Sequence, residues 1–340
     1  MISVAGMSGN QRIGLDAAGR AQSDLVDSSA IDWAQGILPD ASITPVRDRP
    51  WSDIAEVRAG DRLWWLKINK AQTVYEAALL RLLGGVRHRL LPETIVHDRQ
   101  PWLLIADAGH RLDHFDLTGE QRFAIWARLL PEYAELQRSV GVDQLLAVGV
   151  PDFRPATLPG WYDRLIAMLD ADPAARAHLG ADELRALRKI GPWIEELSAE
   201  LAAGLPATLQ HDDLHEGNVL TDDDQQRLTV IDWGDSVVGH PFSTLTVTLG
   251  RLQRQLRLAP DDPALARLRD GYLEAWQCDG VTRRQLRRQA EVAWMLGALN
   301  RVYANYRGLG RLEPALSPDQ PADGLFWVQE LIRASLIRTG

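Results

Sequence analysis

Two apolar runs of β-type residues, each leading into a polar loop, constrain the fold and chemistry of this chain more than any other feature. The first loop lies in Leu209–Leu220 and carries Asp213 and, five residues later, Asn218; the second follows Val230 and carries Asp232. Two carboxylates and an amide are the groups that magnesium-assisted phosphoryl transfer needs. One carboxylate orients or deprotonates an attacking hydroxyl, while amide and carboxylate oxygens hold the hard cation.

The same residues occur in an order known from kinases. Kinases of the eukaryotic type carry His-Arg-Asp, then an Asn five residues after that Asp, then Asp-Phe-Gly beyond a hairpin. Here His211 and Asp213 match the first element, Asn218 the second and Asp232 the third, with Trp and Gly directly after it. The string resembles the aminoglycoside phosphotransferase family of small-molecule kinases, whose usual form is His-Gly-Asp-Leu-His-Pro-Gly-Asn followed by Ile-Asp-Trp.

Two positions depart from this family pattern. Asp212 stands where the family has Gly, and Glu216 stands where it commonly has Pro. Neither departure removes a catalytic atom. Asp212 nevertheless adds a negative charge beside Asp213, which bears on the pKa of that carboxylate and on the local backbone geometry.

The resemblance implies a fold of the α+β class with the two lobes of a protein kinase. Residues 28–106 would form the N-lobe, an antiparallel nucleotide-binding sheet with one helix. Residues 107–340 would form a mostly helical C-lobe with the catalytic loop and the metal-binding hairpin. The resemblance also implies ATP and Mg²⁺ as cofactors, Asp213 as the catalytic base, and Asn218 and Asp232 as metal ligands.

Lys67 is one of only three lysines, and it lies inside an apolar strand-like run, Leu63–Ile68. A lysine buried in such a strand needs an anion. Kinases use a strand lysine to hold nucleotide phosphates and position it with a helix glutamate. Gln72–Leu83 has apolar residues at helical spacing and one acid, Glu76. We predict a Lys67–Glu76 pair that binds nucleotide phosphates; the plain alternative is a lysine that snorkels from an edge strand.

The other predicted nucleotide contacts rest on weaker patterns. Residues 40–59 lack the glycine needed for a phosphate loop and read as two strands joined by a turn at Arg49–Ser52. The hydroxyl of Ser52 or the backbone amides of the turn could contact phosphates, although a plain hairpin is equally consistent. Further along, a strand leads into an Asp-Ala-Gly turn. By resemblance this is the hinge, where backbone groups of Ala106 and Ala108 would bind the adenine edge.

Most of the remaining chain predicts helices. Apolar residues recur at helical spacing in the following segments: Glu120–Val140, Leu158–Leu169, Ala181–Leu201, Phe242–Leu256, Pro263–Trp276, Thr282–Tyr306 and Leu325–Ile337. The acidic run 222–224 predicts a solvated hairpin turn, and His240 in its Gly-His-Pro turn is expected to be structural. Trp233 is expected to pack beneath the site, and the other tryptophans to be core residues.

Two other functions fit parts of the pattern. His211, His215 and a carboxylate could bind zinc as in metallohydrolases, although Asn218 and Asp232 would then have no role. A catalytically weak or inactive kinase-like nucleotide-binding protein is the main alternative, and the intact catalytic residues argue against it. A protein kinase is disfavoured because no Ala-Pro-Glu element or activation segment lies between Asp232 and the helix predicted from Phe242.

The acceptor should be a small hydroxylated molecule bound between the catalytic loop and the C-terminal helices. Asp212, Asp213 and Asp235 place negative charge at that mouth, which predicts a cationic, amine-bearing alcohol such as an aminoglycoside, an amino sugar or a choline-like compound. The family resemblance points the same way, although by the same resemblance neutral sugars, macrolides and homoserine are also possible acceptors.

Length, composition and net charge narrow the classes of protein to which this chain can belong. A length of 340 residues with 46% hydrophobic residues allows two domains with real cores, and residues 1–27 are expected to form a flexible polar extension. A net charge of −9 without a basic stripe argues against nucleic-acid binding. One cysteine, no secretory signal and no run of about 18 apolar residues predict a soluble cytoplasmic protein without a membrane partner. The oligomeric state stays open.

Overall fold

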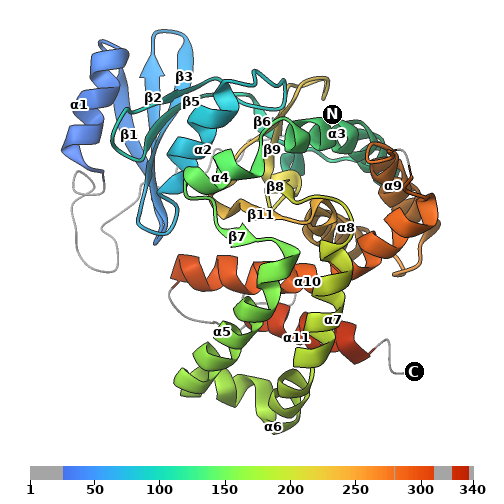
Figure 1. The fold of residues 1–340 in the computed structure, drawn as a ribbon. Coiled ribbons are helices and arrows are strands. Elements are labelled where there is room, and N and C mark those ends of the chain that lie inside the picture. The colour runs from blue at the N-terminus through green and yellow to red at the C-terminus, as the bar shows by residue number, and fades with distance from the viewer. Residues whose placement is uncertain (1–25, 279, 310–323, 337–340) are drawn as a thin grey trace, which may run out of the picture.

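The computed structural model describes residues 26–278, 280–309 and 324–336. Its N-lobe is a five-stranded antiparallel sheet with the strand order β1-β2-β3-β5-β4 (Figure 1). The strands are β1 (Ser42–Asp48), β2 (Ser52–Ala59), β3 (Arg62–Asn69), β4 (Thr94–Val96) and β5 (Trp102–Ala106). This sheet confirms the predicted antiparallel N-lobe and places β3, with Lys67, in its centre.

Side chains alternate between the two faces of β3, so that each face of the N-lobe sheet packs against a different helix. One face packs against α1 (Ser28–Ile37) in a core of apolar residues: Ala30, Ala34, Ala55, Val57, Trp64, Leu66, Ile68, Trp102 and Leu104. The other face carries Lys67 toward α2 (Tyr75–Gly84). The sequence predicted only the second of these helices. The helix α1 buries just Ala30 and Ala34, a weak apolar stripe.

The predicted hairpin between β1 and β2 is present and is held by polar contacts instead of glycine. The backbone amide of Arg49 donates to the carbonyl of Ser52 at 2.9 Å. The amine of Lys70 lies 2.6 Å from Asp48 and 2.7 Å from Asp53, one carboxylate on each strand. These contacts fix the tip of the hairpin above the C-lobe.

Helices form most of the C-lobe. They are α3 (Gly119–Arg138), α4 (Val142–Ala147), α5 (Leu158–Ala171), α6 (Pro173–Lys189), α7 (Gly191–Ala202), α8 (Thr244–Leu256), α9 (Pro263–Glu274), α10 (Arg283–Leu309) and α11 (Gly324–Leu336). The segment predicted as one helix over Ala181–Leu201 is two helices, because Pro192 lies in the first turn of α7 and cannot continue α6. The short helix α4 was not predicted.

Two small sheets lie between the sheet of the N-lobe and the helices and carry the catalytic segments (Figure 1). They contain β6 (His110–Arg111), β7 (Asp152–Phe153), β8 (Thr208–Gln210), β9 (Val219–Thr221), β10 (Leu228–Val230) and β11 (Val237–Gly239). The hairpin of β9 and β10 confirms the turn predicted at residues 222–224. There the carboxylate of Asp222 accepts hydrogen bonds from the backbone amides of Gln226 and Arg227 at 2.7 and 3.2 Å, as in a closed turn.

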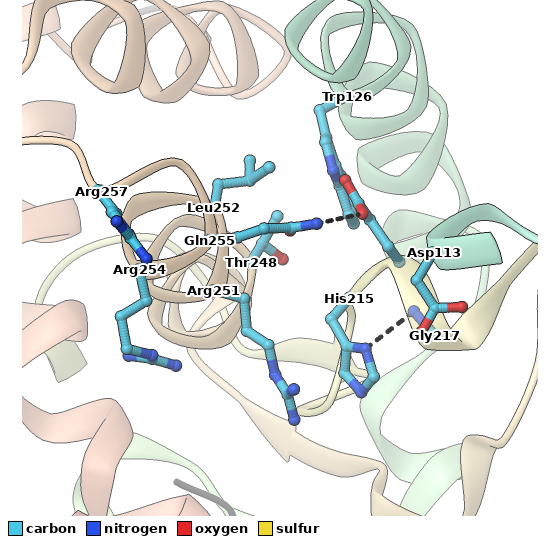
Figure 2. Close-up of a pocket in the computed structure, with 11 residues that line it drawn as sticks. Asp113, Trp126, His215, Gly217, Thr248, Arg251, Leu252, Arg254, Gln255 and Arg257 are labelled. Carbon is cyan, nitrogen blue, oxygen red and sulfur yellow. Dashed lines mark hydrogen bonds between the residues drawn. The ribbon is translucent and has the colours of Figure 1, made fainter. Parts of the chain in front are cut away.

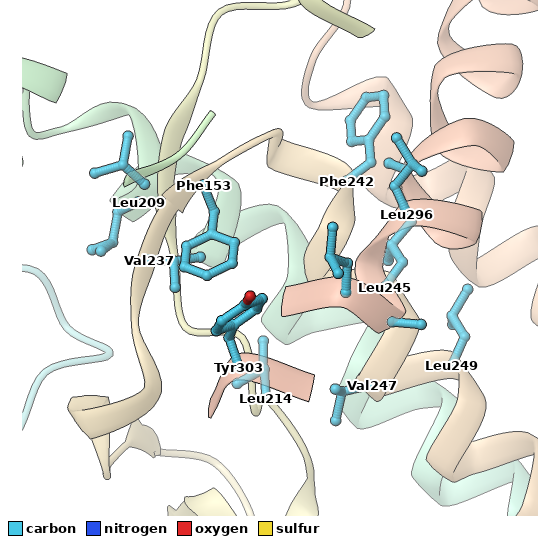
Figure 3. Packing of buried hydrophobic residues seen from close by; sticks show 14 of the residues in the cluster. Phe153, Leu209, Leu214, Val237, Phe242, Leu245, Val247, Leu249, Leu296 and Tyr303 are labelled. Carbon is cyan, nitrogen blue, oxygen red and sulfur yellow. The ribbon is translucent and has the colours of Figure 1, made fainter. Parts of the chain in front are cut away.

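The largest core lies behind the catalytic loop. Leu209 and Leu214 flank that loop and belong to this core, which also contains side chains from β11, α8 and α10 (Figure 3). Trp233 is fully buried and its indole donates to the carbonyl of Val230, which confirms that it packs beneath the site. In the described ranges no helix combines the length and apolarity needed to cross a membrane.

Candidate active site

Lys67 forms the ion pair that the sequence predicted. Its amine lies 2.9 Å from one carboxylate oxygen of Glu76 and 2.7 Å from Asp232. Both Lys67 and Glu76 are buried, which excludes a lysine snorkelling from an edge strand. Burial alone would lower the pKa of Lys67, but the two carboxylates outweigh it and raise that pKa, so the amine stays charged.

A compact connection between β3 and α2 makes this pair possible. The hydroxyl of Thr73 donates to the carbonyl of Trp51 at 2.7 Å and lies 3.2 Å from the side-chain oxygen of Asn69. The backbone amide of Thr73 donates to the carbonyl of Lys70. This closed turn starts α2 directly after β3 and brings Glu76 back over Lys67.

Asp213, Asn218 and Asp232 are brought together by the hairpin that follows β8. The side-chain amide of Asn218 donates to the carbonyl of Asp213 at 2.9 Å and to its carboxylate at 3.3 Å. The backbone amide of Ile231 donates to the carbonyl of Asn218 at 3.0 Å, which ties the two loops together. Because the side-chain nitrogen of Asn218 makes both bonds to Asp213, its side-chain oxygen is not bonded to that residue.

The oxygen atoms of Asn218 and Asp232 fit a magnesium site. The side chain of Asp232 is 48% exposed, and one of its oxygens is bound by Lys67. A carboxylate and an amide oxygen are hard ligands, and Mg²⁺ in nucleotide sites completes its shell with phosphate oxygens and water. The Lys67 charge holds the pKa of Asp232 below its usual value, which keeps this ligand ionised.

A zinc site is not supported in the described part of the chain, where no group of three or more His, Cys, Asp or Glu side chains could hold a metal. His211 is fully buried and uses both ring nitrogens. Its Nε2 lies 2.8 Å from the carbonyl of Ile231, and its Nδ1 accepts from the backbone amide of Asp213 at 3.3 Å. His240 is likewise buried, and its ring nitrogens contact Gln289 and the amide of Phe242. Both histidines are structural.

Asp212 occupies a backbone conformation that explains why glycine is usual at this position. Its φ is 62°, in the left-handed region that glycine adopts without strain. The carboxylate is buried and accepts a hydrogen bond from Asn300 at 3.3 Å. Burial raises the pKa of Asp212 to about 7, although the neighbouring charge of Arg301 opposes this shift. The carboxyl group of Asp212 is therefore buried and hydrogen-bonded within the protein.

Arg301 of α10 forms ion pairs with three acidic residues of the site, and it was not predicted from the sequence. Its guanidinium lies 3.1 Å from Asp213, 3.6 Å from Asp212 and 3.0 Å from Asp235. Burial would raise the pKa of Asp213, but Arg301 and then His215 outweigh it and hold that pKa well below its usual range. An arginine within an apolar helix segment was the available signal, since such a charge needs buried partners.

The second departure from the family pattern is also explained by an ion pair. Glu216 forms an ion pair with Arg122 of α3 and accepts a hydrogen bond from Gln255 of α8 at 3.2 Å. The adjacent His215 is fixed by the amide of Gly217, which donates to its Nδ1 at 3.0 Å. This leaves its Nε2 3.3 Å from the carboxylate of Asp213.

The three other residues predicted to contact the nucleotide, Ala106, Ala108 and Ser52, differ in which of their polar groups are available. The amide of Ala106 already donates to the carbonyl of Glu93 at 2.9 Å, so only its carbonyl could face an adenine. Ala108 lies two residues further on and is buried. Ser52 is also buried, and its neighbour Trp51, not Ser52, lines the cavity next to Asp213.

Two cavities lie near Asp213, and only the first is lined by it. The catalytic cavity, of about 240 Å³, lies between the hairpin tip and α10, and its lining includes Trp51, Asp213, Asp232, Asp235, Arg251, Arg301, Asn305, Arg307 and Trp327. The second, of about 400 Å³, lies between α8 and the catalytic loop, and its lining includes Asp113, Trp126, His215, Glu216, Gly217, Thr248, Arg251, Leu252, Arg254, Gln255 and Arg257 (Figure 2). Arg251 lines both.

The fold and the convergence of Lys67, Asp213 and Asp232 at one place are those of a phosphotransferase of the bilobal kinase type. The family model described as "Phosphotransferase enzyme family" matches residues 67–288, and the chain belongs to that family. No curated protein matches the sequence.

Solved structures of low sequence identity share the fold. The GDP and kanamycin complex of APH(2")-IIia is 16% identical with a TM-score of 0.55, over 92% of this chain and 99% of that one. Plasmodium vivax ethanolamine kinase is 10% identical with a TM-score of 0.59, over 90% and 86%. Macrolide 2'-phosphotransferase MphH from Brachybacterium faecium is 16% identical with a TM-score of 0.53, over 86% and 100%.

Proposed function

We propose that this phosphotransferase moves the γ-phosphate of ATP to a hydroxyl of a small molecule, with Mg²⁺ as the cation. One observation carries the proposal. Asp213 and Asp232 line a single cavity, while Lys67 is paired with Asp232 and Asn218 is hydrogen-bonded to Asp213. Solved structures of similar fold are named as phosphotransferases of aminoglycosides and macrolides and as an ethanolamine kinase. These names support a small hydroxylated acceptor.

Each residue has a definite role in this proposal. Asn218 and Asp232 would hold Mg²⁺, which would supply positive charge against the phosphate groups of the nucleotide. Lys67, positioned by Glu76, would hold phosphate oxygens. The carbonyl of Ala106 and the amide of Ala108 would meet the adenine edge. Ser52 would contribute to the phosphate region through the backbone of its turn, since its side chain is buried.

Asp213 would orient the acceptor hydroxyl and take its proton. The hydroxyl oxygen forms a bond to the γ-phosphorus while the bond from that phosphorus to the bridging oxygen breaks, and the bridging oxygen leaves with ADP. A carboxylate with a lowered pKa is a weak base. It suits a loose transition state, in which orientation and charge stabilisation contribute more than early proton removal.

A coupled assay of nucleoside diphosphate release over a panel of hydroxylated metabolites tests the proposal. Each acceptor is assayed with ATP and with GTP, in the presence and in the absence of Mg²⁺. Magnesium-dependent turnover that falls in Asp213→Asn is the expected result. Nucleotide binding without turnover of any acceptor would favour the inactive kinase-like protein instead. Absence of Mg-ATP binding would reject both.

A further inference from the structure

The charge at the acceptor mouth differs from the charge that the sequence suggested. Asp212, Asp213 and Asp235 all lie within 3.6 Å of the Arg301 guanidinium. Arg307 adds a second cation 3.4 Å from Asp235. The two arginines of α10 therefore offset much of the negative field that predicted a cationic acceptor.

The cavity between α8 and the catalytic loop carries the opposite charge. Two carboxylates line it, and each is already paired: Asp113 with Arg111, at 2.9 Å, and Glu216 with Arg122. Neither of these two arginines is among the lining residues. What faces the cavity beyond these closed pairs is a group of three arginines, Arg251 and Arg254 of α8 and Arg257 directly after its end.

Arg251 and Arg254 lie on one stretch of α8 and repel one another, while Arg257 is the cap residue at its C-terminal end. Arg251 and Arg254 are three residues apart, a spacing at which helix side chains are neighbours. The pKa of Arg254 is lowered by burial and further by the charge of Arg251, while Glu330 offsets part of this. An anion bound between them would relieve the repulsion and form charge-assisted hydrogen bonds.

The arginines are also held in place beside the catalytic base. Thr248, one helical turn before Arg251, donates its hydroxyl to the carbonyl of Leu214 at 2.7 Å and so docks α8 on the catalytic loop. Across the cavity His215 lies 3.3 Å from the carboxylate of Asp213. Figure 2 shows the arginine side chains of α8 on one wall and His215 with Gly217 on the other.

We infer that the acceptor is an anionic hydroxylated molecule, whose carboxylate or phosphate group is held by Arg251 and its neighbours in the cavity between α8 and the catalytic loop. The inference rests on the proposed phosphotransfer. A volume of about 400 Å³ suits a small metabolite, and an acceptor seated there can extend its hydroxyl to Asp213 past Arg251, which lines both cavities. A cationic amine would instead meet the positive charges of the lining arginines, which Glu330 offsets only in part.

A charge series on one sugar scaffold tests the class of acceptor. Binding of glucose, glucosamine, glucuronate and glucose 6-phosphate is measured by calorimetry with Mg-ADP at saturation, so that the nucleotide site is filled. We expect the two anionic sugars to bind more tightly than glucose and glucosamine, with an affinity that falls as salt rises. The two anionic sugars distinguish a carboxylate from a phosphate site. Tighter binding of glucosamine, or equal binding of all four, would overturn the inference.

Two variants locate the site. Arg251→Gln should weaken the preferred anion about tenfold or more, the scale of a lost charge-assisted hydrogen bond. Arg267→Gln, a matched change of an exposed arginine on α9, should leave the affinity unchanged. An anion affinity that is the same in Arg251→Gln and wild type would overturn the inference. The Mg-ATP affinity of each variant is measured in parallel, because failure of nucleotide binding would count against the proposed function and not against the acceptor class alone.

Discussion

The guanidinium of Arg301 lies 3.1 Å from the carboxylate of Asp213, although the two residues are 88 positions apart in the sequence. The same guanidinium contacts Asp212 and Asp235. One buried arginine therefore fixes the carboxylate proposed as the base, pairs with the residue that replaces the usual glycine, and offsets part of the negative charge at the acceptor mouth. The predictions below separate these effects.

Asp213→Asn should fold normally and bind Mg-ATP, yet lose about 10²–10⁴-fold in turnover, the scale of a positioned base. The loss should fall near the lower end, because phosphoryl transfer depends mainly on positioning and charge. Steady-state ADP release with the best acceptor measures it. Full activity in this variant would show that another group orients the hydroxyl.

Asp232→Ala should abolish magnesium-dependent nucleotide binding, and Asn218→Ala should weaken it. Both residues present hard oxygens to one cation, but Asp232 supplies the charge. Calorimetric titration with Mg-ATP and with metal-free ATP checks this. If Asp232→Ala binds Mg-ATP as tightly as wild type, the metal site lies elsewhere.

Arg301→Gln should destabilise the protein by about 3–5 kcal/mol, because three carboxylates lose a buried partner. The pKa of Asp213 should rise toward its ordinary value. Turnover of the variant should then decline on the acid side at a pH where the wild-type carboxylate is still ionised. Denaturant unfolding and the pH profile of kcat measure the two effects. Arg301→Lys keeps the charge and should shift the profile less.

Asp212 should make the protein less stable as the pH rises from about 4 to 7. Its folded-state pKa of about 7 lies above the unfolded value of about 3.9, so in this window the folded chain holds a proton that the unfolded chain has lost. The slope is at most about 1.4 kcal/mol per pH unit. Asp212→Asn tolerates the left-handed backbone and should flatten this dependence.

The exposed hairpin change Asp224→Asn serves as the control for net charge in that experiment. Urea unfolding of the two variants and the wild type at several pH values compares them. Parallel pH curves for Asp212→Asn and wild type would mean that Asp212 stays ionised in the folded state.

The sequence predicted those parts of the site that are local in the chain. Asp213, Asn218 and Asp232 lie on one hairpin, and Lys67 and Glu76 are nine residues apart, so the local motifs and the family resemblance were enough to group them. Arg301 and Arg251 enter from helices whose docking depends on the whole C-lobe core, and no local pattern relates them to Asp213. The partners of the acids at the mouth were not predicted for the same reason, since Asp212, Asp213 and Asp235 are close in sequence while Arg301 and Arg307 are distant.

Errors in the fold have a similar origin. The helix α1 was missed because only Ala30 and Ala34 of it are buried. The break between α6 and α7 had a local signal, Gly191 followed by Pro192, which the apolar periodicity of the segment concealed. Boundaries elsewhere differ by a few residues, as expected where helix ends are set by caps.

The backbone hydrogen bond from Ile231 to Asn218 has a mechanical consequence. It joins the loop of the base to the loop of the metal ligand, and β9 and β10 pair directly beside it. The distance between the group that orients the hydroxyl and the groups that would hold the cation is thus set within one small hairpin. Any adjustment that brings phosphate and hydroxyl into line must come from displacement of the N-lobe sheet or of α8, while this hairpin serves as the fixed reference.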